Sequence, residues 1–162
     1  MTIRISPAQA EDIDSCVEVL FTTNLGKKYY PTEAVAQSQI AKGIEENSFY
    51  FANYGEKCVG YVWFQLKGAF FMYPYLHQIV VRHNLQGRGY GKVLLAFYEQ
   101  QALHNDGSVR LRTKSFLTVE SSNEMAIRMY TNFNYKKVGE IPGLFRKNCQ
   151  EQLMMKELFA PV

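Results

Sequence analysis

The chain has 162 residues, of which 47% are hydrophobic and 20% are charged, and its formal net charge is +3 at pH 7. These values are typical of a globular protein with a core of ordinary size, and we expect a single domain over residues 1–162. The net charge is small and no run of Lys and Arg is present, which argues against nucleic acid as a partner.

The first part of the chain predicts a strand, two helices and a β-hairpin. Alternating residues at the start favour a short strand, and apolar residues at spacings of three and four then favour helices. We expect Gly26 to end the first helix and Thr32 to cap the second. In chain order the expected elements are a strand over residues 2–5, helices over 13–26 and 32–44, and hairpin strands over 49–54 and 58–66.

The rest of the chain predicts strands and helices in alternation. A break at residues 67–68 precedes a long aromatic strand, in which Pro74 indicates an irregularity such as a bulge. Strand is also expected within residues 108–120, although the sequence does not place its boundaries. The other expected elements are a strand over 70–81, helices over about 91–105 and 121–132, and strands over 136–141 and 151–158. The order indicates an α/β fold: a mixed sheet of about seven strands with four helices on its faces.

The sequence does not indicate a membrane segment, a metal site or a disulfide framework. No apolar run reaches membrane-spanning length, and the first residues do not form a signal peptide. We therefore expect a cytoplasmic protein without a membrane partner. The three cysteines lie far apart in the sequence and show no metal-ligand spacing, so we expect neither a bound metal nor disulfides.

Residues 76–95 join an apolar strand, a glycine-rich turn and a helix, which is an arrangement typical of an anion site. Glycines at positions 87, 89 and 91 permit positive φ and a close approach of a ligand to the backbone. The N–H groups of the first helical turn lie at the positive end of the helix dipole, and Arg88 and Lys92 add positive charge. We interpret the turn as a cradle for a diphosphate, and the alternative is a tight turn with a structural role only.

The turn differs from the two commonest phosphate loops. Gly91-Lys92 is followed by Val93, where a P-loop needs Ser or Thr, and the glycine spacing is not that of the dinucleotide fingerprint. The pattern Gln86-x-x-Gly89-x-Gly91 after an apolar strand resembles motif A of the GNAT acetyltransferases. In that family the loop holds the diphosphate of acetyl-CoA. The expected order of elements is also that of the GNAT fold, so the resemblance covers essentially the whole chain.

A second pattern resembles motif B of the same family. Asn123 and Tyr130 lie seven residues apart in the last expected helix, so their side chains project from about the same face. An aromatic-ended turn and a strand follow, as in the family. There the Asn contacts the pantetheine arm and the Tyr protonates the departing thiolate, which implies these roles here. In isolation, Asn123 would be interpreted as a helix cap and Tyr130 as a core residue.

The resemblance implies acetyl-CoA as co-substrate, bound largely by backbone atoms. The pantetheine arm pairs with the strand before the turn, and an N–H of that strand stabilises the oxyanion that forms when an amine attacks the thioester. The implied contacts are Ile79, Val80 and Val81 for the arm, with Val80 or Val81 at the oxyanion, and Gln86, Gly87, Arg88, Gly89, Tyr90, Gly91 and Lys92 for the diphosphate.

One position departs from the family pattern. Many members carry a Glu as general base five residues before the Asn of motif B, and this chain has Thr118 there. A threonine hydroxyl does not act as a general base at neutral pH. The alternatives are His77, Glu120 or a chain of water molecules, and histidine is the residue type that titrates near neutral pH. The sequence leaves the base unassigned.

We therefore predict an acetyl-CoA-dependent N-acetyltransferase that moves the acetyl group to a primary amine by direct attack in a ternary complex. Because the Glu is missing, the alternative is a non-catalytic acyl-CoA-binding sensor. A third hypothesis is an interaction module in which the glycine turn has a structural role only. The acceptor is a small-molecule or peptide amine, which in the family contacts two segments that correspond here to residues 24–31 and 142–148. Family members often pair, so the resemblance also implies a homodimer as an option.

Overall fold

The structure is a computed structural model that describes residues 3–105 and 108–161. Its strands are β1 (Arg4–Pro7), β2 (Phe49–Tyr54), β3 (Lys57–Ala69), β4 (Tyr73–Val81), β5 (His104–Asn105), β6 (Ser108–Val109), β7 (Arg112–Glu120), β8 (Lys136–Pro142) and β9 (Gln150–Phe159). Its helices are α1 (Ile13–Phe21), α2 (Asn24–Tyr29), α3 (Glu33–Glu45), α4 (Tyr90–Leu103) and α5 (Glu124–Asn132), with 3-10 turns η1 (Ala10–Asp12) and η2 (His83–Leu85).

Seven of these strands form one mixed sheet in the order β1-β2-β3-β4-β7-β9-β8, and β5 pairs with β6 separately. β4 and β7 are parallel, whereas β1–β2, β2–β3, β7–β9 and β8–β9 are antiparallel. The mixed α/β fold predicted from the order of elements is confirmed. Four helices occur where the periodicity predicted them, and the short helix α2 is additional. β1 begins two residues later than predicted, and residue 2 lies outside the described residues.

The chain divides into two compact units. The first contains Met1–Phe64 and Gln78–Ala96, and the second contains Gln65–His77 and Phe97–Val162. β3, β4 and α4 contribute residues to both units.

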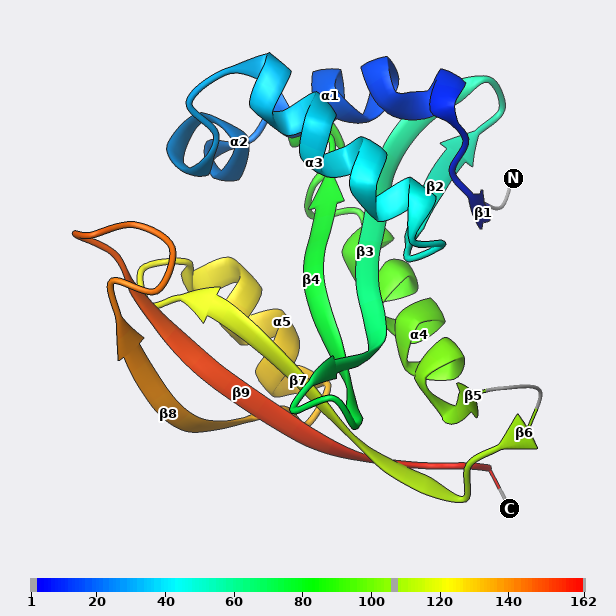
Figure 1. Cartoon of the computed structure of the whole chain (residues 1–162), viewed down its shortest axis with the longest axis vertical. Coiled ribbons are helices and arrows are strands. Elements are labelled where there is room, and N and C mark those ends of the chain that lie inside the picture. Colours follow the sequence, from blue (N-terminus) through cyan, green and yellow to red (C-terminus); the bar gives the residue numbers. More distant parts are fainter. Residues whose placement is uncertain (1–2, 106–107, 162) are drawn as a thin grey trace. The chain divides into compact units, whose positions relative to one another are not determined.

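The core of the first unit lies between helices and strands. α1 and α3 lie side by side (Figure 1). Apolar residues at helical spacing in α1, and residues of β2 and β3, join in one buried cluster. Each buried aliphatic or aromatic side chain contributes about 1.5–3 kcal/mol relative to exposure. The buried residues of this core are Ala8, Cys16, Val17, Val19, Leu20, Tyr30, Ala36, Ile40, Phe49, Phe51, Cys58, Tyr61 and Val80.

One helix boundary of the first unit was predicted correctly and one was not. Thr32 caps α3 by accepting a hydrogen bond from the N–H of Val35 at 3.2 Å, as predicted. α1 ends at Phe21 and not at Gly26, which lies inside α2. The reason is a second cap: the Thr23 hydroxyl accepts from the Gly26 N–H at 3.2 Å and so starts a separate helix.

In the second unit, β9 lies between β7 and β8 (Figure 1). The hydroxyl of Ser115 on β7 lies 2.8 Å from that of Tyr98 on α4, and 2.8 Å from that of Tyr135. These three residues are fully or almost fully buried, and each hydroxyl has a partner, as buried polar groups require. On the same side of the unit, Lys156 Nζ lies 2.8 Å from both carboxylate oxygens of Glu99. A hydrogen bond therefore connects α4 to β7, and an ion pair connects α4 to β9.

The turn between β3 and β4 lies elsewhere than predicted. The expected break at residues 67–68 lies inside β3, which continues to Ala69. The chain reverses at Phe70 and Phe71, whose φ angles are 55° and 56°, and the N–H of Met72 donates to the Ala69 carbonyl at 3.1 Å. Both central residues of a type I′ turn need positive φ, which bulky residues avoid. Two phenylalanines therefore gave no turn signal in the sequence.

Other boundaries follow from that shift or from local caps. Pro74 is the second residue of β4, at a strand end where proline is tolerated, and so it marks no bulge within a longer strand. Within residues 108–120 the structure places a short strand, β6, and a long one, β7. α5 begins at Glu124, three residues later than predicted.

No helix in the described part of the chain is both long and apolar enough to cross a membrane. Residues 3–105 and 108–161 contain no group of three His, Cys, Asp or Glu side chains that could hold a metal ion.

All three cysteines are free, and the fold brings Cys16 and Cys58 together in the core of the first unit. The hydrogen bond between these thiols, followed by burial, raises the pKa of Cys16.

Candidate active site

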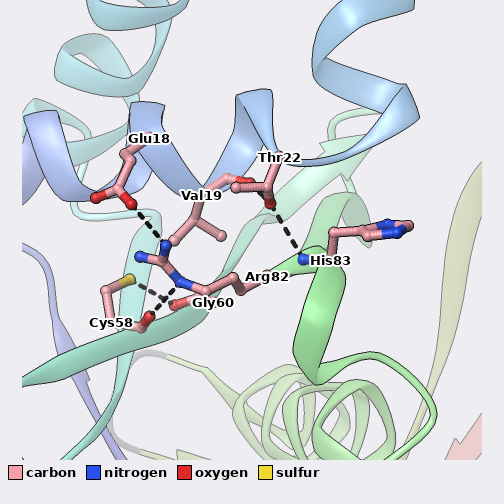
Figure 2. Close-up of polar contacts among 7 residues, drawn as sticks. All are labelled: Glu18, Val19, Thr22, Cys58, Gly60, Arg82 and His83. Atoms are coloured by element: carbon pink, nitrogen blue, oxygen red, sulfur yellow. Dashed lines mark hydrogen bonds and ion pairs between the residues drawn. The ribbon is translucent and has the colours of Figure 1, made fainter.

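The segment that follows β4 is bonded to helix α1 at two points (Figure 2). Arg82 Nη1 donates to Glu18 Oε1 at 2.6 Å, and Arg82 Nε donates to the carbonyl of Cys58 at 3.2 Å. The N–H of His83 donates to the hydroxyl of Thr22 at 3.1 Å, while its imidazole points away from these contacts. These bonds fix the start of the predicted diphosphate loop to the core of the first unit.

Replacing Glu18 with Gln is expected to remove a small, pH-dependent part of the stability. The Arg82 guanidinium, through its hydrogen bond and then its charge, lowers the pKa of Glu18 below the ordinary value of 4.5. A carboxyl with a lowered folded-state pKa stabilises the fold above its ordinary pKa, and this contribution is lost as pH falls through the lowered value. The Glu18 side chain is 64% exposed, so we expect a loss below about 1 kcal/mol at neutral pH.

Urea denaturation of the wild type and Glu18→Gln at about pH 7 and about pH 3 measures this difference. The two proteins should differ at the higher pH and converge at the lower one. A difference of equal size at both pH values would show that the ion pair does not cause it.

The loop after β4 presents free backbone amides. Gly87 and Gly89 have φ angles of 78° and 90°, and a Cβ at either position would meet no atom within 4 Å. α4 begins at Tyr90, and its first amide with a backbone partner is that of Val93, which donates to the Gly89 carbonyl at 3.2 Å. Among the residues that the structure describes, the N–H groups of residues 87–92 donate to no protein acceptor. Unpaired amides at a helix N-terminus favour an anion.

Gln86 makes two hydrogen bonds inside this loop. Its N–H donates to the His83 carbonyl at 3.2 Å, and its side-chain amide donates to the Val81 carbonyl at 3.1 Å. The backbone amide of Gln86 is therefore used inside the loop, and the amides open to a ligand begin at the next residue. Arg88 and Lys92 are both exposed beside those amides, so their charges add to the same positive region.

The strand residues predicted to pair with the pantetheine arm are held against β3. Val80 and Val81 are buried, and Ile79 is half-buried. The Val80 carbonyl approaches Gly60 so closely that a Cβ there would lie 2.2 Å from the oxygen. Only glycine fits such an approach, so the backbone of β4 is fixed on this side just before the loop.

In the second unit, Thr118 occupies the position at which many family members carry a Glu, and its hydroxyl lies beside a second hydroxyl. The Thr118 hydroxyl on β7 lies 2.8 Å from the Tyr75 hydroxyl on β4. The Tyr75 ring meets the His77 ring edge to face, with centroids 4.7 Å apart, and His77 Nε2 lies 3.1 Å from Gln65 Oε1. Burial raises the pKa of Tyr75, so its hydroxyl remains protonated at neutral pH. The surroundings of Thr118 are therefore aromatic and hydrogen-bonded.

The strand register adds a carboxylate that the sequence analysis missed. Glu120 pairs with Glu151 and Thr118 with Leu153, so Glu151 lies on the same face of the sheet as Thr118. Glu151 is only 3% exposed, and its charge contributes to the raised pKa of Tyr75. A Glu between two Gln at the start of a strand gave no signal in the sequence. It is a further candidate for the general base.

Tyr130 is a buried tyrosine on α5 whose hydroxyl has no protein partner among the described residues. Its ring meets that of Tyr135 with centroids 5.9 Å apart. The nearby Tyr98 and Tyr135 differ, because both place their hydroxyls on Ser115. Burial, with a smaller contribution from Tyr75, raises the pKa of Tyr130 above its ordinary value of 10. The phenol therefore keeps its proton at neutral pH and has no other bond to break before donating it.

Asn123 caps α5. Its Oδ1 accepts a hydrogen bond from the N–H of Ala126 at 3.2 Å, and its own N–H donates to the Glu120 carbonyl at 2.9 Å. The residue is exposed, and its side-chain nitrogen has no protein partner in the described part of the chain. The capping role is confirmed, and a contact from that nitrogen to the pantetheine arm stays a prediction.

The two segments predicted to contact the acceptor carry aromatic residues. In the first unit, Tyr30 follows α2 and is buried, and its hydroxyl accepts a hydrogen bond from the Gln78 side chain. Gln78 in turn accepts from the Tyr61 hydroxyl at 2.9 Å, which ties this segment to β4. In the second unit, the connection between β8 and β9 exposes Leu144 and Phe145.

Comparisons with known proteins agree with the family resemblance and with the fold. A sequence model of the acetyltransferase (GNAT) family matches residues 16–135. No curated protein matches the sequence. Among solved structures, the chain is similar to Ard1 from Thermoplasma volcanium, with a TM-score of 0.80 and 16% identity over 99% of this chain and 100% of that one.

Two other solved structures are similar over nearly their whole length. One is the ribosomal-protein-S18-alanine N-acetyltransferase from Escherichia coli, with a TM-score of 0.74 and 14% identity over 99% of this chain and 97% of that one. The other is an acetyltransferase from Salmonella typhimurium with its cofactor acetyl-CoA, with a TM-score of 0.74 and 17% identity over 100% and 97%. At such low identity these likenesses show the fold alone.

The family match decides membership. It covers well over half of the chain and includes the glycine loop, Asn123 and Tyr130. The sequence resemblance noted above and the mixed seven-stranded sheet agree with it. This chain belongs to the GNAT acetyltransferase family.

Proposed function

We propose that this protein is an N-acetyltransferase that moves an acetyl group from acetyl-CoA to a primary amine by direct attack in a ternary complex. The observation that carries the proposal is the exposed loop whose amides at residues 87–92 have no protein acceptor. A diphosphate needs several N–H donors and free space beside them, and the glycines leave that space open. Membership of the family and the likeness to a structure that contains acetyl-CoA support the same ligand.

The proposed reaction uses this chain's residues in separate roles. Acetyl-CoA supplies an activated thioester. The amine nitrogen bonds to the thioester carbon, the carbon–sulfur bond breaks, and Tyr130 gives its hydroxyl proton to the departing sulfur. A base takes the proton that the amine nitrogen loses, and the candidates are His77, Glu120 and Glu151. The amides of residues 87–92 hold the diphosphate, and the backbone of residues 79–81 with Asn123 holds the pantetheine arm.

The acceptor is proposed to be a small-molecule or peptide amine that contacts residues 24–31 and 142–148. The likeness to a ribosomal-protein-S18-alanine N-acetyltransferase supports a peptide N-terminus as one class to test. We propose no metal in the reaction, a cytoplasmic location and, as in many relatives, a homodimer.

Coenzyme A is expected to stabilise the folded protein against heat. A ligand at one hundred times its Kd adds about 2.7 kcal/mol to the free energy of unfolding. Thermal denaturation with increasing coenzyme A measures the shift in Tm, and ATP serves as a control for nonspecific binding of a phosphate chain. If coenzyme A produces no shift at any concentration, the glycine turn has a structural role only.

One observation favours a second candidate function. Thr118 occupies the position at which many family members carry the catalytic Glu, and its hydroxyl forms a hydrogen bond with Tyr75. A protein that binds acyl-CoA without catalysis needs no general base at this position. Release of free thiol from acetyl-CoA with a panel of small amines, amino acids and peptides distinguishes the two. Thiol release with any amine supports the enzyme, whereas tight binding without release from all of them supports a non-catalytic acyl-CoA sensor.

A further inference from the structure

The turn between β3 and β4 exposes three large apolar side chains in a row. Phe70 is 72% exposed, Phe71 is 96% exposed and Met72 is 58% exposed. The Phe70 ring is anchored edge to face on Phe116, with centroids 5.4 Å apart. Contiguous large apolar side chains on a surface are typical of a contact with a protein or a membrane.

The backbone of this turn is strained. Phe70 and Phe71 both have positive φ, at 55° and 56°, where asparagine and glycine are the favoured residues. The two residues therefore reduce stability through the backbone, and their largely exposed rings gain little from burial in return. Such conflicts between local preference and structure concentrate at functional sites.

More exposed apolar side chains lie at the same end of the second unit. β4 and β7 are parallel with Tyr75 opposite Phe116, so the turn that precedes β4 lies level with the start of β7. Arg112 at that start pairs with Phe159 at the end of β9. Phe159 is 61% exposed, and Leu111 is 84% exposed. We call residues 67–73, 111–116 and 157–161 the apolar end.

The charge at the apolar end is basic. Lys67 and Arg112 are exposed there. The one carboxylate among its residues, Glu157, is paired with Lys114 at 3.1 Å. No Asp or Glu occurs anywhere between Glu56 and Glu99, so both strands that lead to and from the turn lack acidic side chains after Glu56. An apolar protrusion with a basic rim is complementary to an anionic surface that has an apolar interior.

We propose that the apolar end is a docking surface for an anionic phospholipid membrane. Phe70, Phe71 and Met72 enter the boundary between head groups and acyl chains, while Lys67 and Arg112 remain among the anionic head groups. The boundary between head groups and acyl chains accepts exposed apolar side chains without a preformed groove. The contact is peripheral, so it replaces the sequence-based expectation of no membrane partner without requiring a spanning segment. It does not depend on the proposed acetyl transfer.

The test uses the whole protein and vesicles of phosphatidylcholine with and without phosphatidylglycerol. Cosedimentation measures the bound fraction of the wild type, of F70N/F71G and of R112E. F70N/F71G removes both rings and supplies a turn with favoured φ, so its Tm should rise while binding falls about tenfold or more. R112E should weaken binding to the anionic vesicles in particular, and added salt should do the same. Met125→Asn removes a 60% exposed apolar side chain from α5 and should bind as the wild type does.

Three results would overturn the proposal. They are no binding of the wild type to anionic vesicles, equal binding of the wild type and F70N/F71G, and an equal loss of binding in Met125→Asn. Sedimentation velocity gives a fourth result that would overturn it. If the wild type self-associates without binding vesicles, and F70N/F71G does not self-associate, the apolar end binds a second copy of the chain. The Tm shift with coenzyme A should be the same in F70N/F71G as in the wild type, which separates this test from that of the enzyme.

Discussion

Replacing Tyr130 with Phe is expected to leave coenzyme A binding unchanged and to lower turnover by about 10²–10⁴-fold, the usual contribution of a general acid. The phenol is buried, its pKa is raised, and its oxygen has no protein hydrogen-bond partner among the described residues. Removing it therefore breaks no bond in the fold and removes only the proton donor. Steady-state kinetics of thiol release, with coenzyme A binding measured by calorimetry, gives both quantities.

Tyr135→Phe is the matched control. Tyr135 is also buried, and it contacts the Tyr130 ring, but its hydroxyl is bonded to Ser115. Its loss should reduce stability by about 1 kcal/mol and leave turnover close to that of the wild type. Equal turnover in Tyr130→Phe and the wild type would show that Tyr130 is not the acid. Equal losses of turnover in both variants would point instead to disturbed packing around α5.

Replacing Gly89 with Ala is expected to raise the Kd for coenzyme A by about tenfold. Gly89 has a φ of 90°, where an alanine is strained by roughly 1–2 kcal/mol, and 1.4 kcal/mol corresponds to tenfold in an equilibrium constant. No atom lies within 4 Å of the added Cβ, so the variant meets no clash with the protein itself. The loop can relieve the strain only by moving the amides that follow Gly87. Calorimetric titration with coenzyme A measures the change.

Gly55→Ala separates strain from binding. Gly55 lies in the turn between β2 and β3, has a φ of 63°, and also has no atom within 4 Å of an added Cβ. Both variants should lose a similar amount of stability in urea, and only Gly89→Ala should lose affinity. If both variants bind coenzyme A as the wild type does, the loop does not form the diphosphate site.

The sequence by itself determined the elements and the family. Helical and alternating patterns of apolar residues placed α3, α4, β2 and β9 within two residues, and also the start of α1, because these patterns follow from local geometry. The glycine loop and the pair Asn123 and Tyr130 could be found in the sequence for the same reason, because each motif is contiguous in the chain, and their roles stay predictions. The family resemblance that they carried was then confirmed by a match over residues 16–135.

Where local rules were broken, the sequence misled. Glycine near residues 67–68 suggested a turn, but the chain turns at Phe70 and Phe71, which local preference disfavours. Gly26 suggested a helix end, but the hydroxyl of Thr23 starts a new helix there. In both places a glycine favoured the predicted boundary. At Phe70 a contact with Phe116 accompanies the turn instead, and at Gly26 the cap by Thr23 starts a new helix.

Only the tertiary structure decided which distant side chains meet. Arg82 reaches Glu18 and Cys58, Thr118 meets Tyr75, and the register of β7 with β9 brings Glu151 to the face of Thr118. No local propensity encodes these contacts, because strand register and helix packing set the distance between residues that are far apart in the chain. For the same reason the sequence could name Tyr130 as a candidate acid but could not show that its hydroxyl, unlike that of Tyr135, has no hydrogen-bond partner among the described residues.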